Sequence, residues 1–149
     1  MFKVSIEQVD KAANEEIIIK CHEINDDVLS IVNKLKENDQ KANTISGFKG
    51  EDIYSIKIKD IYYVEATENR TFIYCADNEY ESKLKLYEVD ELVRNYKFFR
   101  CSKSIILNYS KIECVTPAFN GRFEAKLLNG EKVIISRQYV PVLKEILGL

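Results

Sequence analysis

A short basic segment carries the residue types best suited to bind a polyanion. No carboxylate occurs between Glu91 and Glu113, and neutral hydroxyl groups at Ser102 and Ser104 are interleaved with cationic side chains there. Such a mixture suits phosphate oxygens, which accept hydrogen bonds from both kinds of group. The cations are Arg94, Lys97, Arg100, Lys103 and Lys111. Taken alone, the cluster is equally typical of DNA binding and of a solvated sheet end.

Catalytic and metal-binding signals are sparse. There is no glycine-rich phosphate loop and no GxSxG motif, and His22 is the only histidine. The cysteines are far apart and include no CxxC pair, so a zinc site is not expected; they are Cys21, Cys75, Cys101 and Cys114. Reduced, mostly buried thiols are the favoured interpretation, and a redox switch at Cys101 is the alternative. We predict no enzymatic activity, no metal, no cofactor and no small-molecule substrate.

Composition is that of an ordinary globular protein, with 46% hydrophobic and 31% charged residues and a net charge of −2. The charge is unevenly distributed. Residues 1–46 carry 6 Lys and Arg against 9 Asp and Glu, whereas residues 47–149 carry 16 against 15. The nine tyrosines and seven phenylalanines favour core packing on strands over base stacking. Apolar runs are short and no signal-peptide core follows Met1, so we expect a cytoplasmic protein.

The first part of the chain is predicted to be a β-β-α segment, residues 1–43. Residues 2–9 alternate apolar and polar, and residues 16–23 contain three consecutive isoleucines, so each is predicted as a strand. Residues 26–37 have helical apolar spacing after a capping residue at Asn25 or Asp26. Residues 37–43 are the predicted linker. This segment cannot bury both its faces alone, so we expect it to pack on the rest or on a second copy.

Residues 44–149 are predicted to be a β-rich domain. Strands are expected at residues 53–59, 60–66, 71–76, 80–84 and 105–107, with a helix from Leu86 to Tyr96. Two Asn-Gly pairs, residues 120–121 and 129–130, predict consecutive hairpins because both residue types tolerate positive φ. A closing helix over residues 139–147 contains Pro141 in its first turn, where the missing N–H costs little.

Three spaced motifs in this second part resemble the LytTR family of bacterial DNA-binding domains. They are IYYVE at residues 61–65 followed by Asn69-Arg70, FFRCSKSIILN at residues 98–108, and NGE at residues 129–131 followed by ISRQY at residues 135–139. The central motif departs from many members in having Ser102 in place of a histidine and Lys103 at the next basic position. Lysine keeps the charge but lacks the guanidinium fork of arginine.

The resemblance implies a mainly β fold (α+β overall) of elongated antiparallel sheets with short helices. It also implies that loops over residues 67–71, 100–104 and 136–138 enter successive major grooves of double-stranded DNA. The side chains expected to read bases are Lys103, Arg137, Asn69 and Arg70. Those expected to bind phosphate are Arg100, Ser102, Ser104, Ser136 and Gln138.

The chain also resembles short, stand-alone members without a receiver domain. The expected function is therefore sequence-specific regulation of transcription at promoter repeats. A homodimer is expected, with the acidic N-terminal segment as its dimerisation or regulatory part, and a small membrane protein is a candidate antagonist. The alternative is a protein-interaction module, such as an anti-activator, without a DNA role of its own.

Overall fold

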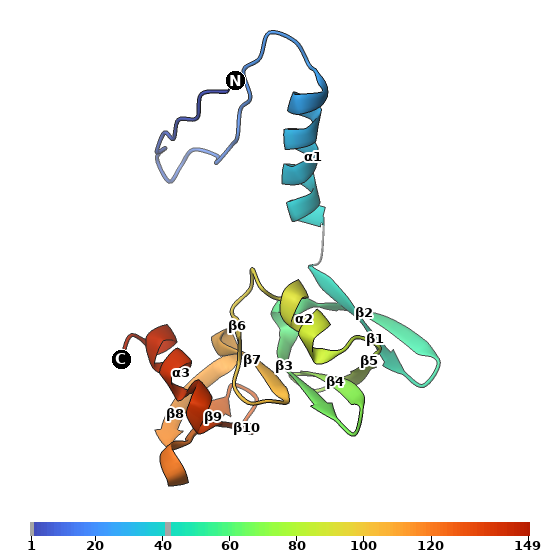
Figure 1. Cartoon of the computed structure of the whole chain (residues 1–149), viewed down its shortest axis with the longest axis vertical. Helices are drawn as coiled ribbons and strands as arrows, with labels where there is room; N and C mark the ends of the chain where they lie inside the picture. Colours follow the sequence, from blue (N-terminus) through green and yellow to red (C-terminus); the bar gives the residue numbers. More distant parts are fainter. Residues whose placement is uncertain (1, 41–42) are drawn as a thin grey trace. The chain divides into compact units, whose positions relative to one another are not determined.

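The computed structural model describes residues 2–40 and 43–149, and the chain divides into two compact units, one ending at Gln40 and the other beginning at Lys41 (Figure 1). The first unit contains helix α1, Asp26–Gln40. The side-chain Oδ1 of Asn25 accepts a hydrogen bond from the backbone N of Val28 at 3.0 Å, which is the capping contact that the sequence predicts. Asp26 and Asp27 stand in the first turn, where the helix dipole favours negative charge.

The predicted β-β-α organisation of the first unit is wrong in its strands. Residues 2–25 contain no strand, and their apolar side chains are largely exposed. The helix prediction is confirmed, but α1 continues to Gln40, so residues 37–40 of the predicted linker are helical; residues 41–42 lie outside the described residues. Alternation of apolar and polar residues predicts a strand only if a partner backbone is present, and a lone two-stranded hairpin is marginal in water.

The second unit is built on two antiparallel sheets. The larger contains seven strands in the order β2-β1-β5-β4-β3-β7-β6, and the smaller has the order β10-β9-β8. The larger sheet comprises β1 Thr44–Lys49, β2 Asp52–Lys57, β3 Ile61–Thr67, β4 Arg70–Cys75, β5 Glu79–Ser82, β6 Phe98–Arg100 and β7 Ile105–Asn108. The smaller comprises β8 Ile112–Pro117, β9 Phe123–Leu127 and β10 Lys132–Ile135. The mainly β fold with short helices is therefore confirmed.

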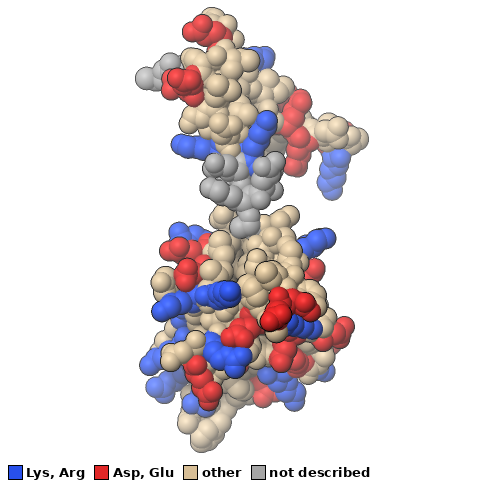
Figure 2. All heavy atoms as spheres, turned by 90° about the vertical axis from the view of Figure 1, so that its right-hand side faces the viewer, with Lys and Arg blue, Asp and Glu red and all other residues tan. Residues whose placement is uncertain are grey.

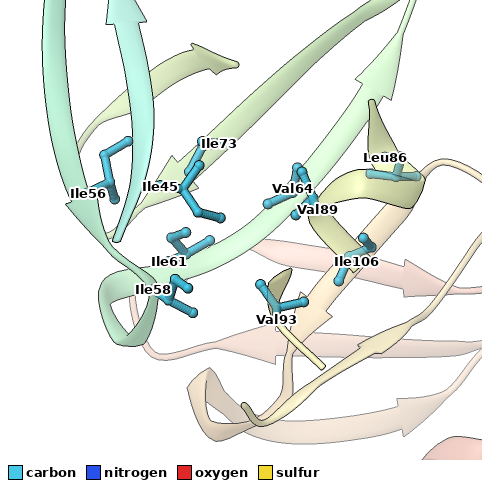
Figure 3. Close-up of a cluster of buried hydrophobic side chains, with 10 residues drawn as sticks. All are labelled: Ile45, Ile56, Ile58, Ile61, Val64, Ile73, Leu86, Val89, Val93 and Ile106. Carbon is cyan, nitrogen blue, oxygen red and sulfur yellow. The ribbon is translucent and has the colours of Figure 1, made fainter. Parts of the chain in front are cut away.

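One hydrophobic core fills the space between the larger sheet and helix α2, Leu86–Leu92. Figure 3 shows ten aliphatic side chains converging there from the strands, from the turn at Ile58 and from the helix. Val64, Ile73 and Ile106, on three neighbouring strands, are fully buried. The helix ends earlier than the predicted Tyr96 because a turn follows it, in which the N–H of Tyr96 donates to the carbonyl of Val93.

A second core joins the smaller sheet to α3, Val140–Leu147, which lies beside it in Figure 1. Strands β3 and β7 also contribute to this core through Tyr62 and Leu107, so they separate the two cores. Both Asn-Gly hairpins form as predicted. Asn120 and Gly121 have φ of 60° and 72° in the β8–β9 connection, and Gly130 has φ of 89° in the β9–β10 connection.

Asn108, at the end of β7, links that strand to the start of β3, its neighbour in the larger sheet. Its side chain is 2% exposed. The Nδ2 donates to the carbonyl of Ile61 at 2.8 Å, and the Oδ1 accepts from the backbone N and the Oγ of Ser110 at 3.0 and 2.7 Å. Every polar atom of a buried amide needs a partner, and here the partners fix the start of β3 against the end of β7.

Candidate nucleic-acid interface

The central basic loop joins β6 to β7, and its own hydrogen bonds give it a defined shape. Arg100 is paired with Ile106 in the antiparallel register, and the N–H of Cys101 donates to the carbonyl of Ile105 at 3.1 Å. The N–H of Ser104 donates to the Oγ of Ser102 at 3.2 Å. The loop is therefore held by a short hairpin at its base and by a serine turn at its tip.

Arg100 lies along the inner side of this loop. Its Nη1 donates to the carbonyl of Lys103 at 3.1 Å, while its Nε is buried without a hydrogen-bond partner. An unpaired buried donor is uncommon. The guanidinium spans the loop from β6 to the carbonyl of Lys103.

The side chain of Cys101 anchors the same loop in the second core. Its side chain is fully buried in the second core, and burial raises the pKa of its thiol to about 12. Reactive cysteines have lowered pKa values and some exposure. This environment favours the structural interpretation of Cys101 over the redox switch.

The loop over residues 136–138 is tied directly to the central loop. The N–H of Ser136 donates to the carbonyl of Cys101 at 2.8 Å, and the N–H of Tyr139 donates back to the carbonyl of Ser136 at 2.9 Å. Arg137 and Gln138 then form an exposed single turn, Arg137–Tyr139, that leads into α3. The aliphatic stem of Arg137 passes the β8–β9 turn, because a Cβ built on Gly121 would lie 3.0 Å from its Cδ.

The β3–β4 hairpin is tied to the other side of the central loop. The N–H of Ala66 donates to the carbonyl of Ser104 at 2.9 Å. The turn that follows consists of Glu68 and Asn69, with φ of 50° and 61°, as in the two-residue turns whose twist matches antiparallel strands. Asn69 is exposed at the tip.

A shallow hollow of about 400 Å³ lies where the hairpin, the central loop and the start of α2 meet. Asn69, Arg100, Lys103 and Ser104 line it, as does Tyr87, whose side chain is 63% exposed. Sequence reasoning missed Tyr87 because it treated this helix as a cover for the core. The signal was available, since Tyr87 lies outside the helical spacing of the buried residues Leu86, Val89 and Val93.

Arg70 is placed differently from the other predicted base readers. Its Nε and Nη2 donate to the two carboxylate oxygens of Glu81 at 3.0 and 2.8 Å, and its guanidinium lies 5.1 Å from the ring centre of Phe72. The hydrogen bond from Arg70 lowers the pKa of Glu81. Arg70 thus points along the sheet toward β5 and is not among the residues lining the hollow.

One side of the molecule is seen in Figure 2. There, the part of the second unit that carries the β1–β2 hairpin in Figure 1 shows basic and acidic groups interspersed. A surface of mixed sign does not build the field that attracts a polyanion. The three loops connected by backbone hydrogen bonds are the candidate interface.

Within residues 2–40 and 43–149, no helix has the length and apolar character needed to cross a membrane. The same residues contain no group of three or more His, Cys, Asp or Glu side chains arranged to hold a metal ion.

Comparison with known proteins supplies the family. The sequence profile of the LytTr DNA-binding domain matches residues 51–148. The fold matches the LytTr DNA-binding domain of a methyl-accepting/DNA response regulator from Bacillus cereus, with a TM-score of 0.67 and 24% identity over 71% of this chain and 97% of that one.

Similar full-length sequences fall into two size classes. The Enterococcus faecalis sensory transduction protein LytT is 36% identical over 68% of this chain, and the chain spans 42% of its length. An HTH-type transcriptional regulator of Staphylococcus aureus strain NCTC 8325 is 30% identical over 92% of this chain and 94% of its own length. A profile match over most of the second unit, together with a relative of matching length, decides the assignment: the chain belongs to the LytTr DNA-binding domain family.

Proposed function

We propose that this DNA-binding transcription regulator reads double-stranded promoter DNA through three loops that act as one rigid surface. The observation that carries the proposal is a pair of backbone hydrogen bonds, from Ala66 to Ser104 and from Ser136 to Cys101. They tie the outer loops to the two ends of the central loop. Side chains that must reach DNA together gain from such preorganisation, because less freedom is lost on binding.

Within this surface we assign base contacts to Lys103 and Arg137, supported by Asn69 at the hairpin tip. Cationic side chains pair with the O6 and N7 acceptors of guanine in the major groove, and asparagine pairs with adenine. Arg70 would have to break its ion pair with Glu81 before it could reach a base, so we assign it a base contact only when that pair is broken. The phosphate contacts are assigned to Arg100, Ser102, Ser104, Ser136 and Gln138, which set position rather than sequence preference.

The remaining parts of the proposal concern the whole protein. We assign it a homodimeric state, because a single copy presents a small surface and paired repeats raise affinity through effective concentration. The exposed apolar residues of the first unit support that unit as the dimerisation or regulatory part, and a small membrane protein as its antagonist. We assign the protein to the cytoplasm, where bacterial DNA lies, and we assign it no catalytic step.

A footprint of the purified chain on the DNA upstream of its own gene tests the function. We expect protection of repeated sites, with an affinity that falls steeply as salt rises. For about three to five phosphate contacts, log K against log[salt] should have a slope of about −3 to −4.5. Absence of a footprint together with a salt-independent interaction with a protein would instead identify an interaction module.

A further inference from the structure

The first unit contains a segment that has the sequence of a buried strand but no backbone partner. Ile17 and Ile18 are 74% and 65% exposed, although consecutive β-branched residues are typical of strands covered on both faces. Among the described residues, the backbone of residues 14–21 makes no hydrogen bond to another backbone group. An unpaired apolar strand is a template for pairing with another chain.

The charges of this segment are arranged symmetrically about Ile18. Glu16 precedes it by two residues and Lys20 follows it by two. If two copies of the segment run antiparallel with Ile18 opposite Ile18, each Glu16 lies opposite a Lys20 of the second copy. Opposite charges directly across antiparallel strands stabilise the pair, and like charges destabilise it.

We propose that residues 15–21 pair antiparallel with the same residues of a second copy, around a two-fold axis beside Ile18. This inference rests on the homodimer of the proposed function and specifies its interface. A two-fold interface uses the same patch on both subunits, so self-complementary charge is the property that it requires. The occupant is therefore a second copy of this chain.

The packing beneath the segment supports that occupant. An open hollow of about 620 Å³ lies between the segment and α1, and its apolar lining consists of Ile17, Ile19, Val32 and Leu35. Ile18 is not among the lining residues, whereas the charged residues Glu15, Glu16 and Lys36 are. On pairing as a strand, Ile17 and Ile19 would share one face and Ile18 the other. In the proposed register Ile19 of the second copy lies opposite Ile17, which extends the apolar lining across the axis.

Residues 2–9 contain a competing register. Lys3 and Glu7 are symmetric about Ser5, so this segment could also pair with itself. It alternates apolar and polar residues, which suits a strand with one wet face. We therefore place it outside the two-fold axis and use it as the matched control.

Charge exchange in the full-length chain tests the interface. Glu16→Lys and Lys20→Glu should each raise the dimer dissociation constant about tenfold at low salt, because two cross-strand attractions become two repulsions. An equimolar mixture of the two variants should return to within about threefold of the natural chain, since every cross-strand pair is then opposite in charge. The double variant Glu16→Lys/Lys20→Glu should do the same. Sedimentation equilibrium without DNA measures all four, with circular dichroism to verify that α1 is retained.

The same measurements can overturn the inference. A natural chain that stays monomeric, or a mixture that dimerises no better than its components, excludes this interface. Lys3→Glu should leave the dimer dissociation constant within about twofold of the natural value. If Lys3→Glu instead raises that constant about tenfold and Lys20→Glu leaves it unchanged, the two-fold axis lies at Ser5. Affinity for a single half-site, followed by fluorescence anisotropy, should be the same in every variant. If the natural chain does not bind a half-site at all, the proposed function is refuted, while the dimer interface is not affected by that result.

Discussion

Arg137 depends on a glycine sixteen positions earlier for the course of its side chain. A Cβ on Gly121 would lie 3.0 and 3.2 Å from the Cδ and Cγ of Arg137, which is tighter than most side chains tolerate. The conformation of the β8–β9 turn and the position of a proposed base reader are thus coupled. A substitution at Gly121 can therefore change DNA recognition through the position of Arg137.

Gly121→Ala should change DNA recognition more than stability. The substitution strains a backbone with φ of 72° and pushes Arg137 aside, so we expect a loss of about 1–2 kcal/mol in stability together with weakened base discrimination. Gly130→Ala is the matched control, because its φ is also positive and open space surrounds it. Urea unfolding should show similar losses for both, and binding to single-base operator variants should be altered only in the first. Equal effects on DNA would show that Gly121 does not aim Arg137.

The bidentate pair between Arg70 and Glu81 makes a second prediction. Glu81→Gln removes a carboxylate beside the proposed interface and weakens the hold on the guanidinium, so DNA affinity should rise about two- to tenfold if Arg70 contacts DNA. The double variant with Arg70→Ala should lose that gain apart from a smaller effect of net charge. Anisotropy titrations at one salt concentration make the comparison. If the gain persists in full without Arg70, the side chain has a structural role only.

Strands and loops show which parts of this fold were predictable. The Asn-Gly hairpins and the polar loops were predictable from the sequence, because the residue preferences of turns are local. The strands at residues 2–9 and 16–23 were not, since a strand exists only where another backbone pairs with it. Strand β6 has three residues, too few for any periodicity. The pairing of Arg70 with Glu81 follows from the β4–β5 register, which places Phe72 opposite Glu81 and which no local pattern specifies.

The junction of β3 with β7 supports the central loop and is open to test at Asn108. Asn108→Asp replaces the donor facing the Ile61 carbonyl with a second acceptor, so we expect a loss of about 2–4 kcal/mol near neutral pH. The loss should shrink in acid, where the protonated carboxyl regains a donor. Asn129→Asp is the control, because the Nδ2 of Asn129 also donates to a backbone carbonyl, that of Ala76, and its Oδ1 also accepts from a backbone N–H, that of Glu131, at a half-buried position. Equal losses in urea unfolding would argue against burial as the cause.

Across the whole domain, the buried thiol of Cys101 should make stability fall in alkali. Its pKa is raised from 9.0 to about 12 by burial, so the unfolded chain releases its proton first. Its contribution is intact below pH 9 and is lost between about pH 9 and 12, with a slope of up to about 1.4 kcal/mol per pH unit. Cys101→Ala should flatten this part of the curve, whereas the exposed Cys114→Ala should not. An unchanged alkaline slope in Cys101→Ala would contradict the assignment.

In the proposed function, one connected surface of the whole domain divides its work between base reading and phosphate binding. Arg137 has an anchored stem and an exposed head, which suit base reading. Arg100 spans its own loop through the Lys103 carbonyl and suits a phosphate. Arg137→Ala should therefore flatten the preference at one base-pair position, at a cost of about 1–3 kcal/mol in discrimination. Arg100→Ala should weaken specific and random DNA equally.

The most direct measurement is a binding titration of both variants, and of Lys103→Ala, against a panel of operators that each carry one base change. The predicted result is a loss of preference confined to one position for Arg137→Ala and a uniform loss for Arg100→Ala. Lys103→Ala should show a positional loss if the lysine reads a base. A uniform loss of affinity across the panel for Arg137→Ala would make Arg137 a backbone anchor and contradict the central claim.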